Sequence, residues 1–171
     1  MGLFNYDSSS IESILKYTEE RLIGRTLYDI LEEFQNSEYK TYEDKKKGIP
    51  STANRKEISE LSKGIYGSLM EKAGYGIEPN SSPEADIPAA KVEIKTTPYR
   101  VTANGAISAK ERLVLSMFNF HEENLDDFYQ THLWHKCQNI LLLFYKYQKT
   151  RDISNNITDK FFLFDWPEED M

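Results

Sequence analysis

The stretch Asp86-Ile87-Pro88-Ala89-Ala90-Lys91-Val92-Glu93-Ile94-Lys95 decides how this chain of 171 residues is interpreted. It has the form D-x6-E-x-K, and its second half predicts a short β-strand over residues 92–97. Residues two apart in a strand point to the same face, so Glu93 and Lys95 should share a side, about 6–7 Å apart. Pro88 prevents one unbroken ladder strand, so Asp86 can fold back beside Glu93. Two carboxylates and an ammonium would then lie close together. These are the smallest set of groups that can bind Mg²⁺ beside a phosphodiester.

The rest of the chain predicts helices first and strands later. Ser9 to Glu12 has the form of a capping box, and apolar residues follow at helical spacing until Gly24. Thr26 should cap a second helix, and a third is predicted over 57–73, after a polar surface loop at 36–55. The remaining signals are strands at 112–118, 138–145 and 160–166, a turn at Asn104-Gly105 and a helix around 125–132. This order predicts an α/β or α+β class with a mixed sheet.

Composition places the chain among globular proteins, with 39% hydrophobic and 13% aromatic residues. No apolar run approaches the ~20 residues of a membrane span, and the start lacks the basic and apolar regions of a secretory signal. The single cysteine, Cys137, excludes an internal disulfide and a cysteine-based zinc cluster. We therefore expect a cytoplasmic protein with no membrane partner. We expect residues 1–171 to be one domain, a size compatible with the N-terminal catalytic domain of a longer protein.

The net charge of −7, taken alone, argues against a nucleic-acid partner. Basic residues nevertheless gather locally, at Lys45 to Lys47, at Arg55-Lys56 with Lys63, and at Lys110 with Arg112. Screening limits electrostatic effects to about 8–10 Å, so the charge that faces a phosphate matters more than the total. Net charge therefore does not exclude DNA.

Further blocks of sequence extend the motif and carry a resemblance. Besides 92–98, they are Gly24-Arg25-Thr26-Leu27, Lys63-Gly64-Ile65-Tyr66-Gly67 with Glu71, Pro83-Glu84-Ala85-Asp86, Ser108-Ala109-Lys110-Glu111-Arg112-Leu113-Val114-Leu115, and Thr131-His132-Leu133-Trp134-His135-Lys136. In this order they resemble the MutH family, which joins a mismatch-repair nicking endonuclease to the Sau-type restriction endonucleases that cut GATC. The resemblance implies a restriction-endonuclease-like α/β fold, with a mixed central sheet flanked by helices. It also implies Mg²⁺-dependent cleavage of double-stranded DNA at GATC, with Mn²⁺ as a substitute.

The resemblance also implies roles for individual residues. The metal ligands would be Asp86, Glu93 and the helix carboxylate Glu71, with the Ile94 carbonyl as the natural main-chain candidate. The catalytic set would be Asp86, Glu93, Lys95, Glu71 and Lys136, the last near the cleaved phosphate. Lys63 and Gly64 sit where the family approaches DNA.

Residues outside this set also carry predictions. Lys110 and Arg112 could contact guanine edges or phosphates, or could form a solvated charge pair with Glu111. Lys45, Lys46 and Lys47 would touch phosphate or water and carry no sequence information. Lys91 stands where the repair enzyme has a glycine, so we predict a bulge or turn there.

The block from Ser108 to Leu115 is closest to the restriction-enzyme branch, so we favour a type II restriction enzyme. One alternative is a strand-nicking repair endonuclease that needs an activating partner. Another is a catalytically silent DNA-binding regulatory domain. Because GATC is a palindrome, self-association or a second domain could serve its two halves.

Overall fold

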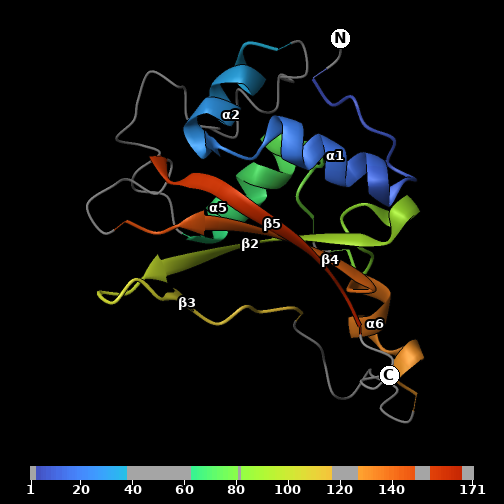
Figure 1. The fold of residues 1–171 in the computed structure, drawn as a ribbon. Helices are drawn as coiled ribbons and strands as arrows, with labels where there is room; N and C mark the ends of the chain where they lie inside the picture. The colour runs from blue at the N-terminus through green and yellow to red at the C-terminus, as the bar shows by residue number, and fades with distance from the viewer. Residues whose placement is uncertain (1–2, 38–62, 81, 117–126, 149–154, 167–171) are drawn as a thin grey trace.

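The computed structural model describes residues 3–37, 63–80, 82–116, 127–148 and 155–166. They form a mixed five-stranded sheet in the order β1-β5-β4-β2-β3, with α1, α2 and α5 along one side of it (Figure 1). The strands are β1 (Arg25–Thr26), β2 (Val92–Val101), β3 (Ile107–Ala109), β4 (Asn139–Lys146) and β5 (Ile157–Asp165). β2 and β4 are parallel, and the other pairs are antiparallel. The predicted α/β fold with a mixed sheet is confirmed.

Two helices begin at hydroxyl caps close to those predicted. α1 (Ile11–Arg21) starts at Ser10, whose hydroxyl accepts the N–H of Ser13, so the cap lies one residue after the predicted Ser9. α2 (Leu27–Gln35) starts at Thr26 with a reciprocal capping box to Asp29. Such caps satisfy N–H groups that have no partner inside the helix.

The third helix carries an irregularity that the sequence pattern does not predict. α5 (Lys63–Leu69) continues directly into the π-helix η1 (Met70–Gly74). The aromatic ring of Tyr66 on α5 stacks on Tyr145 of β4, with ring centroids 4.3 Å apart, and its hydroxyl lies 3.3 Å from that of Thr158. α5 and η1 are therefore fixed over the sheet. The part of the predicted helix before Lys63, and the predicted loop from 38 onward, lie outside the described residues.

The core lies between the helices and one face of β2 and β4. Ile94 and Leu141 on that face are at most 1% exposed, as are Leu27, Leu31 and Met70 from the helical layer. Burying a side chain of this size stabilises a fold by about 1.5–3 kcal/mol. Because side chains alternate along a strand, this anchoring turns Glu93 and Lys95 to the opposite face of β2.

Two sequence predictions about secondary structure are wrong. Residues 112–116, the described part of the predicted strand 112–118, lie outside any strand. The strand that pairs with β2 on the side away from β4 is instead β3, which follows the predicted turn at Asn104-Gly105. The predicted helix around 125–132 is, over its described part, a short 3-10 turn, η3 (Phe128–Gln130), and the α-helix α6 (His132–Lys136) follows it.

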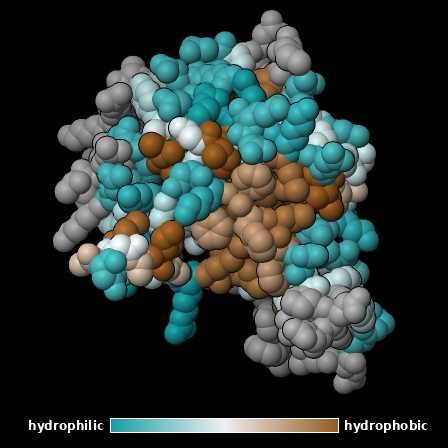
Figure 2. All heavy atoms as spheres, viewed as in Figure 1, coloured by the Kyte–Doolittle hydropathy of each residue, from teal (hydrophilic) through white to brown (hydrophobic). Residues whose placement is uncertain are grey.

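The apolar segment 161–164 is only partly core, because alternation divides it between two faces. Phe161 and Leu163 pack against the core, whereas Phe162 is 57% exposed. Figure 2 shows hydrophobic side chains gathered into a patch on the face of the molecule that is turned to the viewer. Among the described helices, none is long and apolar enough to pass through a bilayer.

Candidate functional site

A tight turn brings Asp86 back to Glu93. Ile87 and Val92 pair as an antiparallel bridge, with N–H···O distances of 2.9 and 3.2 Å, around the 3-10 turn η2 (Pro88–Ala90). Lys91 closes this turn in the left-handed region, at φ 54°, so the predicted turn at this position is present. The main chain then locks the two acids together. The Asp86 N–H donates to Glu93 Oε2 (3.2 Å), and the Ile94 N–H donates to Asp86 Oδ2 (2.8 Å).

Two lysines from different elements meet the Glu93 carboxylate, which is 1% exposed. Lys95 Nζ lies 2.5 Å from Glu93 Oε1, and Lys136 Nζ, from α6, lies 3.7 Å from the same oxygen. Lys136 also donates to the carbonyl oxygen of Ser82 at 2.9 Å. The structure thus assembles Asp86, Glu93, Lys95 and Lys136. It adds the Ser82 carbonyl, a main-chain contact that has no signature in sequence.

The electrostatics of this group raise the pKa of both Glu93 and Lys95. Burial raises the pKa of Glu93, and the neighbouring Asp86 adds to this effect, although both lysines oppose it. Burial is the largest single effect on Lys95 and lowers its pKa, but the hydrogen bond to Glu93 and the negative charges of Glu93 and Asp86 together outweigh burial, so the pKa is raised. Lys95 is therefore an ammonium at neutral pH, suited to orienting water or stabilising negative charge rather than to accepting a proton.

Glu71 joins the group from the π-helix η1. Burial, together with the negative charge of Asp86, raises its pKa to about 7, against the opposing effect of the Lys95 ammonium. A π-turn inserts an extra residue per turn and is frequently found at functional sites. Three carboxylates therefore lie within electrostatic range of one another.

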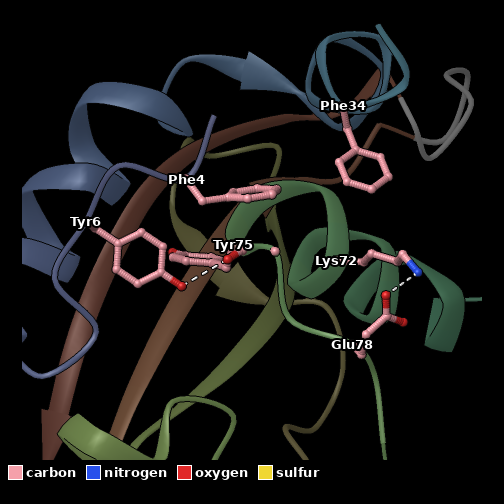
Figure 3. A pocket seen from close by; sticks show the side chains of 7 residues that line it. Phe4, Tyr6, Phe34, Lys72, Tyr75 and Glu78 are labelled. Atoms are coloured by element: carbon pink, nitrogen blue, oxygen red, sulfur yellow. Dashed lines mark hydrogen bonds and ion pairs between the residues drawn. The ribbon is translucent and has the colours of Figure 1, made fainter. Parts of the chain in front are cut away.

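The next residue, Lys72, faces a different part of the molecule. Its ammonium pairs with Glu78 at 2.6 Å beside a hollow of about 260 Å³ that Phe4, Phe34 and other aromatic side chains line (Figure 3). This hollow contains none of the grouped carboxylates. It is separate from the candidate site.

The donor set of the site fits a hard divalent cation. Among the described residues, no group of three or more histidine, cysteine, aspartate or glutamate side chains is arranged as a metal cage. Mg²⁺ commonly uses only one or two carboxylates, completed by water and substrate phosphate. Asp86, Glu93 and the adjacent Ile94 carbonyl offer such oxygens, and a cation would relieve the repulsion that raises the pKa of Glu71.

The structure describes only some of the residues predicted to contact DNA. Lys110 Nζ lies 4.0 Å from the centroid of the Tyr147 ring and 3.9 Å from Glu111 Oε2. The second contact is the charge pair with Glu111 that was the alternative to DNA binding. Arg112 is exposed and lines a hollow that also contains Lys95. Lys63 and Gly64 begin α5, but their side chains are outside the description, and Lys45, Lys46 and Lys47 lie wholly outside it. Their contacts with DNA stay predictions.

Comparison with known proteins identifies relatives of this chain. Residues 75–171 match the family model described as DNA mismatch repair enzyme MutH. The chain belongs to the MutH family. As a MutH-family chain it is also 32% identical, over 112 residues, to the type II restriction enzyme Sau3AI of Staphylococcus aureus. That match covers 66% of this chain but only 23% of Sau3AI, so the shared part is about a quarter of the relative. The resemblance inferred from sequence, including its restriction-enzyme branch, is confirmed.

Proposed function

We propose that this MutH-family chain is the nuclease domain of a type II restriction endonuclease, which hydrolyses double-stranded DNA with Mg²⁺, or Mn²⁺ in its place. The observation that carries the proposal is the convergence of Asp86, Glu93 and Lys95, with Glu93 buried and Lys95 charged. Family membership and the match to a restriction enzyme support the same chemistry.

The residues divide the work of hydrolysis. Phosphodiester hydrolysis is among the slowest uncatalysed reactions, so the site must lower its barrier by well over about 10 kcal/mol. A divalent cation held by Asp86, Glu93 and the Ile94 carbonyl would supply neutralisation of the phosphate charge. Lys95, fixed on Glu93, orients the attacking water and stabilises the pentacovalent phosphorus. Water forms the new P–O bond while the bond to the 3′ oxygen breaks, leaving a 5′-phosphate and a 3′-hydroxyl.

Lys136 and Glu71 complete the proposed site from two further elements. Lys136 is held by the Ser82 carbonyl and lies close enough to Glu93 to hold a second positive charge near the cleaved phosphate. Glu71 would bind a second cation, because the negative charges of Asp86 and Glu93 lie close enough to raise its pKa. We assign both to the catalytic set.

GATC is the target that the resemblance to the Sau-type enzymes implies, and we propose it for this chain. Among the described residues, Arg112 is exposed and lines the same hollow as Lys95, which supports a role in DNA binding. Two copies, or a further domain, would serve the two halves of the palindrome.

A second candidate function is strand nicking in mismatch repair, since the matching family model carries that description. A third, a silent DNA-binding domain, is disfavoured because the three catalytic groups are assembled.

Plasmid cleavage separates these functions. Supercoiled plasmids with and without GATC are incubated with the protein in Mg²⁺ or in EDTA. Linear fragments that require both GATC and Mg²⁺ support the restriction enzyme, and nicked circles support the repair enzyme. Retardation on a gel without cutting in either buffer would refute an active nuclease.

A further inference from the structure

A small hollow is lined by Lys95 and by residues to which the proposed catalytic mechanism gives no role. Its volume is about 260 Å³, and the side chains of Glu71, Lys95, Thr96 and Arg112 line it together with Gly67 of α5. Glu111 lines it too, so two acidic and two basic side chains share the space, and a phosphate there would lie against Lys95 and the exposed guanidinium of Arg112.

Gly67 is not required by the packing of the described residues. A glycine inside an α-helix weakens the helix relative to alanine. A Cβ built on Gly67 would lie 3.5 Å from Thr96 Oγ1 and 3.9 Å from Glu71 Oε1, which are ordinary van der Waals distances. Gly74 differs, because a Cβ there would lie 3.1 Å from the Met70 sulfur. Packing therefore explains Gly74, whereas the bare surface at Gly67 leaves room for something outside the chain.

The Thr96 side chain faces this bare surface. Thr96 follows Lys95 on β2 and is half-buried, and its hydroxyl takes part in none of the hydrogen bonds that the described residues form. A hydroxyl can donate one hydrogen bond, and threonine commonly donates to phosphate oxygens of DNA. Thr96 and Lys95 alternate along β2, but both line the same hollow, so the hydroxyl is available within the space that Lys95 also reaches.

We propose that Thr96 and Gly67 form a contact point for a backbone phosphate oxygen of the DNA. The Thr96 hydroxyl donates to that oxygen, and Gly67 lets the phosphate approach the helix closely. The inference rests on the proposed nuclease function and adds two substrate-positioning residues to it.

Three variants test the contact point: Thr96→Val, which keeps the shape but removes the hydroxyl, Thr96→Ser, which keeps the hydroxyl, and Gly67→Ala, which fills the space. Affinity for a GATC duplex is measured by fluorescence anisotropy in EDTA, so that metal binding does not contribute, and each melting temperature is recorded. We expect Thr96→Val and Gly67→Ala to weaken binding about tenfold and Thr96→Ser to stay within about twofold. Gly67→Ala should melt no lower than the wild type.

Gly74→Ala is the matched control, because it places a methyl group on the same helical segment but against Met70. It should lower the melting temperature while the folded protein keeps its affinity for DNA. Wild-type affinity in both Thr96→Val and Gly67→Ala would overturn the inference, as would a clear fall in the melting temperature of Gly67→Ala. If the wild type itself neither binds nor cuts DNA, the proposed function fails first.

Discussion

Replacing Glu71 by glutamine should stabilise the metal-free protein at alkaline pH. Burial raises the pKa of Glu71 from 4.5 to about 7, with Asp86 adding to the effect. The folded protein therefore keeps the proton on Glu71 where the unfolded chain has already lost it. Linkage then requires stability to fall as the pH rises from about 4.5 to about 7. Glutamine, which resembles the protonated acid and cannot ionise, removes this loss.

The magnitude follows from the size of the pKa change. Moving a carboxyl pKa from 4.5 to about 7 corresponds to at most about 3.4 kcal/mol, at 1.36 kcal/mol per pH unit. Glu71 is only partly buried, so solvent screening reduces the effect, and we expect about 1–2 kcal/mol at pH 8. For a domain of this size that is a rise of several degrees in melting temperature. Below pH 4.5 the two proteins should melt together.

The assay is thermal denaturation in EDTA from pH 4 to pH 8.5, for the wild type and Glu71→Gln. Glu19→Gln is the control, because Glu19 is an exposed carboxylate on α1, away from the site. Its difference from the wild type should not change with pH. A difference for Glu71→Gln that is flat across this range, or that grows toward acid, would refute the raised pKa of Glu71.

Three further predictions concern the proposed catalytic residue Lys95, the turn at Lys91 and the proposed DNA-binding surface. Lys95→Ala should abolish plasmid cleavage and leave gel retardation nearly intact; loss of both would assign the lysine to binding. Lys91→Gly should raise the free energy of unfolding by up to about 1 kcal/mol, measured by urea denaturation, because Lys91 occupies the left-handed region, whereas Lys91→Val should lower it. DNA affinity should fall with salt, with a log–log slope of about −0.9 per phosphate contact, and salt-insensitive binding would count against a surface that includes Arg112.

Much of the site was predictable because its residues are close in sequence. The D-x6-E-x-K spacing, with Pro88 inside it, was enough to predict that Asp86 folds back beside Glu93. The structure shows how: a 3-10 turn and a left-handed Lys91 reverse the chain, and main-chain hydrogen bonds hold the acids together. Lys136 and Glu71, far away in sequence, were identified only through the resemblance, since no local pattern records such a contact.

The misses have physical causes. The segment 112–116 has strand-forming residues, but it does not pair with β2. The Asn104-Gly105 turn places β3 against β2 instead, because β3 comes directly after the turn in sequence. The π-helix at Met70–Gly74 has the same apolar spacing as an ordinary helix end, so it shows no sequence signal. For segment 112–116, tertiary context overrides the local strand preference.

The most direct test of the central claim is anomalous diffraction from Mn²⁺ in crystals of the protein with a GATC duplex. We expect a peak about 2.1 Å from oxygens of both Asp86 and Glu93 and from the Ile94 carbonyl, with Lys95 facing the phosphate beside it. A manganese peak elsewhere, with the two carboxylates bound only to lysines and main-chain N–H groups, would contradict the claim.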